Sequence, residues 1–170
     1  MNEQAKEVTE KTRELTDAQV RERILQLGFG GDRARFDAFV NALKEALPDD
    51  VTVVVRGSAV IGVRWEDGSP FDAGGPGTSD LDLTLVGAEI LEFYKVTGFF
   101  VPGIHSRPLS DEDPDIAPEL VPLRQRLMEM VHRPVNIQAT RDFVMYLRGE
   151  LIGQPYLTLI DKDGTGEPGT

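Results

Sequence analysis

Two aspartates stand one residue apart at the start of an apolar run, in the stretch GTSDLDLTLVG of residues 77–87. Side chains alternate across a β-strand, so Asp80, Asp82 and Thr84 share one face and the leucines between them share the other. The two carboxylates then lie about 6–7 Å apart at their Cα atoms, where unpaired like charges repel. A hard divalent cation relieves that repulsion, and oxygen ligands suit Mg²⁺ or Mn²⁺. The alternative interpretation is a strand cap beside an ordinary surface carboxylate.

A second polar pair, Gly57-Ser58, interrupts the apolar stretch VVVRGSAVIG of residues 53–62. Glycine lets the backbone approach a ligand closely, and serine offers a hydroxyl and an amide at the start of a turn or helix. Exposed N–H groups at such a turn bind phosphate. An ordinary turn is the alternative at this position.

The helices and strands that must position these residues are predicted from the spacing of apolar residues and from the residues that begin or end helices and turns. Thr16 and Gln19 have the spacing of a capping box, and Gly28 is expected to end that helix. A long loop, rich in proline, glycine and acid, is expected over residues 98–115. The expected helices cover 16–28, 36–47 and 119–131, with a short helix after Thr140, and the expected strands cover 51–55, 81–86, 134–140 and 155–160.

Strands interleaved with helices predict an α/β (α+β) fold in one domain over residues 16–160. By composition, residues 1–15 form a flexible polar segment and residues 161–170 a disordered tail. The polar N-terminal residues do not have the apolar segment of a secretory signal, and no apolar run is long enough for a transmembrane helix. The sequence contains no cysteine. A soluble cytoplasmic protein is therefore expected.

The net charge of −11 argues against a protein that binds duplex nucleic acid, because neutralising phosphates requires clustered Lys and Arg. The paired arginines, such as Arg124 and Arg126, are expected on solvated helix surfaces. A small nucleotide remains compatible with this charge, since a metal ion and a few backbone amides can neutralise it.

VVVRGSAVIG followed by SDLDLTLV resembles the nucleotidyltransferase superfamily typified by DNA polymerase β, in particular its small, minimal domains. The resemblance covers about residues 51–160, and it implies a mixed sheet flanked by helices. It also implies that Gly57 and Ser58 contact the phosphates of a nucleoside triphosphate, while Asp80 and Asp82 are catalytic residues that bind Mg²⁺ (or Mn²⁺). The implied reaction transfers a nucleotidyl group to a hydroxyl of a small molecule, an RNA end or a protein, with release of pyrophosphate.

The sequence departs from that family in two places. Twenty-one residues separate Ser58 from Asp80, about twice the usual number, and the extra length is an excursion over Trp65–Pro76. Trp65 or Phe71 is either a packing residue or a platform for a base. The family's third carboxylate lies on a later strand, and here the matching stretch is PVNIQ, with Asn136 at the catalytic position.

Asparagine is a neutral ligand that does not accept a proton as a carboxylate does. A substitute acid could come from Glu92 or from Asp111, Glu112, Asp113 and Asp115 of the acidic loop, although these residues are expected to be solvated charges. His105 is either a surface residue or a group on the acceptor side. Two alternatives to an active transferase therefore stay open: a catalytically impaired nucleotide-binding module of the same fold, or an interaction protein such as a toxin–antitoxin component.

Overall fold

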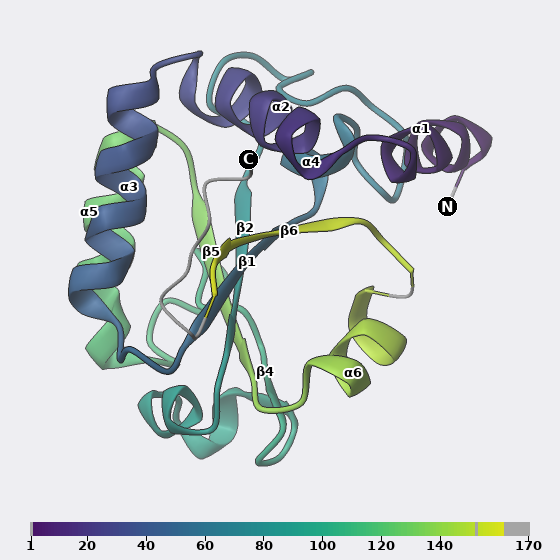
Figure 1. The fold of residues 1–170 in the computed structure, drawn as a ribbon. Coiled ribbons are helices and arrows are strands. Elements are labelled where there is room, and N and C mark those ends of the chain that lie inside the picture. Colours follow the sequence, from purple (N-terminus) through teal and green to yellow (C-terminus); the bar gives the residue numbers. More distant parts are fainter. Residues whose placement is uncertain (1, 152, 162–170) are drawn as a thin grey trace.

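The computed structural model describes residues 2–151 and 153–161, which fold as helices around one mixed sheet (Figure 1). The helices are α1 (Glu3–Arg13), α2 (Asp17–Phe29), α3 (Arg33–Ala46), α4 (Ser58–Ile61), α5 (Val121–Val131) and α6 (Phe143–Tyr146). The strands are β1 (Thr52–Arg56), β2 (Leu81–Val86), β3 (Phe99–Val101), β4 (His105–Ser106), β5 (Val135–Thr140) and β6 (Tyr156–Ile160). Three short 3₁₀ turns (Glu89–Phe93, Val96–Gly98 and Pro118–Leu120) and a π-helical turn (Leu147–Leu151) connect them.

The six strands are ordered β3-β4-β5-β2-β1-β6. β2 runs antiparallel to β1 and parallel to β5, so these three strands form the centre of the sheet. In their register Asp82 of β2 lies opposite Arg56 of β1 on one side and Asn136 of β5 on the other. The prediction of a single domain of mixed α and β structure is confirmed, as a six-stranded mixed sheet with helices.

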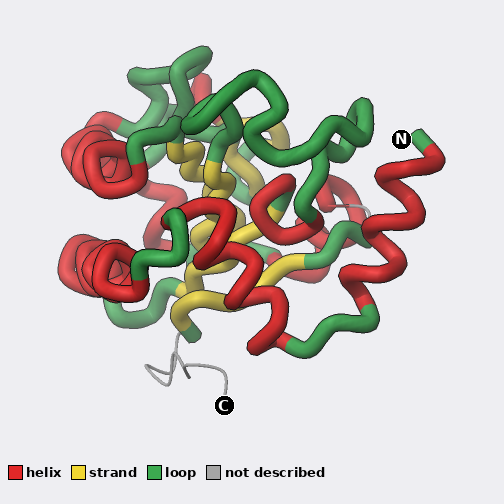
Figure 2. The backbone as a smooth tube through the Cα atoms, turned by 90° about the horizontal axis from the view of Figure 1, so that it is seen from above, coloured by secondary structure: helices red, strands yellow, loops and turns green. Residues whose placement is uncertain are grey.

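The two faces of the sheet differ in what covers them. Leu81, Leu83 and Leu85 of β2 are at most 1% exposed and lie in the helix-covered core, where α3 and α5 run side by side (Figures 1 and 2). On the opposite face Thr84 lies 2.8 Å from the hydroxyl of Tyr146 in α6. Helix α6 thus covers the far end of the polar face, and Asp80 and Asp82 line a cavity at the other end.

The N-terminal segment, expected to be flexible over residues 1–15, instead forms helix α1. Asn2 caps it by accepting a hydrogen bond from the Ala5 N–H at 2.8 Å. Ala5 is buried, and Thr12 accepts a hydrogen bond from Arg23 at 2.8 Å, which ties α1 to α2. The helix packs through small and polar residues, so it lacks the apolar period that would have predicted it.

Two other boundaries differ from the expectation. The capping box of Thr16 and Gln19 is present, but α2 continues past Gly28 to Phe29 and is capped by Gly30 in the left-handed conformation (φ 61°). Gly28 instead lies inside the helix, where it makes room for the side chain of Leu81. The expected loop over residues 98–115 contains the short strands β3 and β4, whose few residues leave no alternation to detect.

The expected tail over residues 161–170 lies outside the described residues apart from Asp161. None of the helices in the described ranges combines the length and the apolar character needed to cross a membrane.

Candidate functional site

Asp80, Asp82 and Asn136 converge on one edge of the polar sheet face, as the strand periodicity predicted. The Nδ2 of Asn136 donates hydrogen bonds to Asp80 Oδ2 at 2.8 Å and to Asp82 Oδ1 at 3.0 Å. The amide therefore bridges the two carboxylates and partly offsets their repulsion. Its Oδ1 atom is buried and has no hydrogen-bond partner among the described residues.

The carboxylate of Asp82 is electrostatically perturbed by its surroundings. Burial raises its pKa, and repulsion from Asp80 and Glu66 acts in the same direction. The positive charge of Arg56 and the hydrogen bond from Asn136 lower it, without cancelling the effect of burial. A cation bound here would stabilise the ionised form of Asp82.

The backbone of Gly57 lies close to the carboxylate of Asp82. It adopts φ 81° and ψ −153° immediately before α4, a conformation that L-residues with a side chain rarely adopt. A Cβ atom at this position would lie 2.6 Å from Asp82 Oδ2. Ser58 is the first residue of α4 and lines the same cavity, so the turn and the two aspartates form one site.

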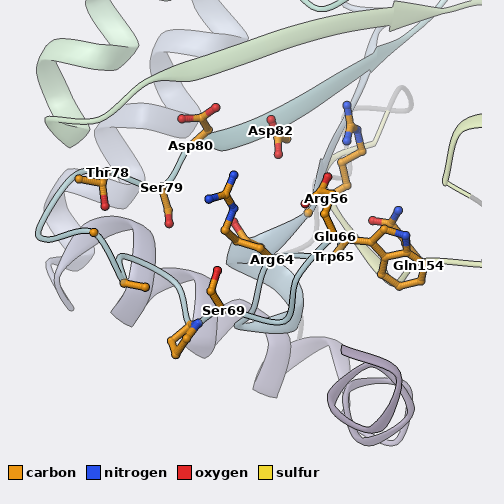
Figure 3. Close-up of a pocket in the computed structure, with 15 residues that line it drawn as sticks. Arg56, Arg64, Trp65, Glu66, Ser69, Thr78, Ser79, Asp80, Asp82 and Gln154 are labelled. Atoms are coloured by element: carbon orange, nitrogen blue, oxygen red, sulfur yellow. The ribbon is translucent and has the colours of Figure 1, made fainter. Parts of the chain in front are cut away.

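A polar cavity of about 440 Å³ opens beside these residues (Figure 3). Much of its wall comes from the long connection between α4 and β2, which was predicted to lie beside the phosphate site. The lining residues from that connection include Arg64, Trp65, Glu66, Ser69, Thr78 and Ser79. Trp65, the sole tryptophan of the chain, is in position to contact a ligand.

A partly buried ion pair fixes the connection to the rest of the domain. Arg133 donates to both carboxylate oxygens of Asp72, at 2.8 and 3.0 Å, and its guanidinium lies 4.7 Å from the ring centre of Phe71. Asp72 also accepts the Ser79 N–H at 2.9 Å, which fixes the end of the connection. Phe71 is buried, so it is a packing residue and not a platform for a base.

Arg56 is held by side chains of the neighbouring strands. Its Nε donates to Thr84 Oγ1 at 3.2 Å and one terminal nitrogen donates to Gln138 Oε1 at 2.9 Å. Arg56 also lines the cavity, where it is a positive charge close to Asp82. Arg56 was not predicted as a site residue, although its position directly before Gly57 could have indicated that it lies beside the site.

Two of the acids considered as substitutes for the missing third carboxylate are occupied elsewhere. Asp113 forms an ion pair with Arg107 at 3.0 Å, and Asp111 pairs with Arg124 at 2.7 Å. Glu92 lines a different cavity. None of them lines the cavity beside Asp80, so the acidic loop does not supply the third group.

Two residues expected at the surface are buried. Arg124 is 7% exposed and donates to the Val135 carbonyl at 2.7 Å, in addition to its ion pair. His105 is 3% exposed and its Nδ1 lies 2.7 Å from Thr140 Oγ1, so it is neither a surface histidine nor a lining residue of the cavity. Each of the two residues forms a hydrogen bond with a polar group of β5. Such long-range contacts cannot be predicted from a local sequence pattern.

The described residues contain no group of three or more His, Cys, Asp or Glu side chains that could hold a metal ion. The acidic pair with its amide neighbour is thus a two-carboxylate site. Compared with family models, curated proteins and solved structures, the chain matches none of them.

Proposed function

We propose that the chain binds a nucleoside triphosphate together with Mg²⁺ or Mn²⁺ in this cavity and transfers the nucleotidyl group to an acceptor hydroxyl. The supporting observation is the convergence of Asp80, Asp82 and Gly57 at a polar cavity of about 440 Å³. The mixed sheet with helices is the coarse architecture that the sequence resemblance implies, and it carries Asp82 and Asn136 on adjacent parallel strands.

The donor set fits a magnesium ion. No basic side chain among the described residues forms an ion pair with Asp80 or Asp82, so both carboxylates are available as ligands. Mg²⁺ is commonly bound by one or two carboxylates, with phosphates and water completing its coordination. The unpartnered Oδ1 of Asn136 is one further oxygen, which half a turn of the amide would direct toward the acidic pair.

In the proposed reaction, the acceptor oxygen forms a bond to the α-phosphorus as the bond to the bridging oxygen breaks. Pyrophosphate leaves with that electron pair, and the hydroxyl proton goes to a base. A bound magnesium ion supplies charge neutralisation at the phosphates. Ser58 contributes its hydroxyl and the first N–H of α4, which has no acceptor within the helix.

Other lining residues suit the remaining parts of a nucleotide. Arg64 is an exposed cation on the wall of the cavity, and Figure 3 shows its guanidinium directed into it. A guanidinium binds phosphate oxygens in pairs. The indole of Trp65 offers a flat face to a base.

The second candidate function is nucleotide binding without transfer, and Asn136 favours it. Where the resembling family has a third carboxylate, this chain has an amide that donates to both aspartates. Such a site can retain ligand binding while losing the group that receives a proton.

Titration of Trp65 fluorescence with ATP, GTP, CTP and UTP, each with and without Mg²⁺, tests the binding. We expect a magnesium-dependent change with at least one nucleotide, which Asp80→Ala abolishes and Asp37→Ala, on the exposed side of α3, leaves intact. Binding that is equal in the parent and Asp80→Ala would refute the assignment of the site. Release of pyrophosphate then separates transfer from binding alone.

A further inference from the structure

The candidate site needs a group that receives the proton of the acceptor hydroxyl. Asn136 is an amide, and Asp80 and Asp82 are committed to the cation in the proposed function. Of the described residues that line the cavity, one further side chain is acidic, and it is Glu66. This residue lies in the connection between α4 and β2, far along the chain from β5.

A tight turn holds Glu66 at the wall of the cavity. The Arg64 N–H donates to the Ser69 carbonyl at 2.8 Å, and the Gly68 N–H donates to the Arg64 carbonyl at 2.9 Å. Val63 and Pro70 form a β-bridge just outside the turn. The turn is therefore closed by backbone hydrogen bonds, and the side chain of Glu66 is not needed to hold it.

Nothing in the described part of the chain binds the Glu66 carboxylate: it has no hydrogen bond or ion pair there, and it is exposed to solvent. Asp67, its neighbour, instead accepts hydrogen bonds from Ser69 and so belongs to the turn. Glu66 is close enough to Asp82 for its charge to contribute to the raised pKa of that aspartate. Figure 3 shows Glu66 and Asp82 around the same cavity.

We propose that Glu66 is the catalytic base of the transfer reaction and takes over, from the connection between α4 and β2, the role of the carboxylate that Asn136 lacks. This inference rests on the proposed function. The hydroxyl proton passes to the Glu66 carboxylate while the acceptor oxygen bonds to the α-phosphorus and pyrophosphate departs. Glu66 then releases the proton to water, and no further reactant is required.

The position of Glu66 favours the acceptor side over the metal. Together with Asp80 and Asp82 it does not form a cluster that could hold a metal ion within the described residues. In the proposed reaction the acceptor hydroxyl lies in the cavity that this carboxylate and the acidic pair both line. General base catalysis by a positioned carboxylate contributes about 10²–10⁴-fold to a rate.

The test compares Glu66→Gln with Glu92→Gln, an exposed glutamate that lines a different cavity. Pyrophosphate release is measured from Mg²⁺ complexes of ATP, GTP, CTP and UTP, with water, short RNA carrying a 3′-hydroxyl, and the chain itself as acceptors. Affinity for each complex is measured by calorimetry on the same samples. We expect Glu66→Gln to lower turnover at least about 100-fold, with Kd changed by less than about twofold, and Glu92→Gln to change neither.

A rescue variant makes the inference specific. Adding Asn136→Asp to Glu66→Gln returns a carboxylate to the site from β5, and we expect at least about tenfold recovery of turnover. If the double variant is as inactive as Glu66→Gln alone, the inference that Glu66 replaces a carboxylate at position 136 is wrong. Full activity of Glu66→Gln, or equal losses of binding and turnover, would also overturn it.

The parent protein separates this inference from the function on which it rests. If it binds none of the four nucleotides with Mg²⁺, the proposed function fails. If it binds a nucleotide but releases no pyrophosphate with any of the three acceptors, Glu66 is not a catalytic base, and binding without transfer is supported.

Discussion

Replacing Asn136 by aspartate changes one atom of the amide that bridges the acidic pair. The amide makes two hydrogen bonds to charged acceptors, at 2.8 and 3.0 Å. Such bonds each contribute about 1.5–3 kcal/mol, so losing both would cost about 3–6 kcal/mol. Protonation of one of the three carboxyls restores one bond, which leaves an expected loss of about 2–3 kcal/mol in the free energy of unfolding at pH 7 without metal.

The pH dependence of this loss has a definite sign. Crowding raises the carboxyl pKa values in the folded protein above those of the unfolded chain, so the folded state binds more protons. Stability relative to the parent is therefore recovered as the pH falls from 7 toward 5, and lost again as it rises. Mg²⁺ at 100 times its Kd would stabilise the folded variant by about 2.7 kcal/mol, which approximately cancels the loss.

Urea denaturation at pH 5 and pH 7, without Mg²⁺ and with Mg²⁺ at about 100 times its Kd, measures these effects. Asn41→Asp, on the exposed surface of α3, makes the same chemical change away from the site and is the matched control. If Asn136→Asp has the same stability as the parent at pH 7 and the same response to Mg²⁺, then residue 136 does not lie beside Asp80 and Asp82 as described.

Three further predictions concern single positions. Gly57→Ala should lose about 2–4 kcal/mol in denaturation, because φ is 81° and a Cβ would lie 2.6 Å from Asp82, whereas Gly30→Ala, at φ 61° with open space, should lose only about 1–2 kcal/mol. Hydrogen bonds from Arg133 hold the pKa of Asp72 below its usual value, so this pair stabilises the fold at and above about pH 5 and its contribution declines as the pH falls below about 4. The difference in unfolding free energy between the parent and Asp72→Asn, about 1.5–3 kcal/mol at pH 7, should therefore shrink in acid, and a constant difference would contradict the pairing. Asp82→Asn removes a carboxylate whose pKa burial raises, so thermal denaturation without metal should show a melting temperature higher by about 2–4 °C, with no response to Mg²⁺.

The centre of the site was predictable because two short-range rules determine it. The alternation of side chains along β2 places Asp80 and Asp82 on one face, and the same alternation in β5 places Asn136 on a polar face. Parallel pairing of β2 with β5 then sets Asp82 opposite Asn136. Gly57 was predictable for a related reason, since a glycine after an apolar strand marks a close backbone approach.

The walls of the cavity were not predictable in the same way. Glu66 and Arg64 lie in a segment with no periodicity, and their placement depends on the ion pair of Asp72 with Arg133, 61 residues apart. The burial of His105 likewise depends on pairing between β4 and β5. Composition describes such residues as solvated loop charges, because the partners that position them are distant in the sequence.

The ion pair of Asp72 and Arg133 also affects how freely the wall of the cavity can change in sequence. It secures the connection at its second half, while the β-bridge of Val63 and Pro70 secures the first half, so the turn over residues 64–69 is bounded by fixed points on both sides. A ligand then meets a preformed wall and does not have to order a lid, which keeps the entropic cost of binding low. Residues at the tip of that turn can be exchanged without disturbing the sheet that holds the acidic pair. Under the proposed function, ligand selectivity can therefore be altered at the other positions of this turn, while Glu66 keeps its proposed role and the acidic pair stays in place on the sheet.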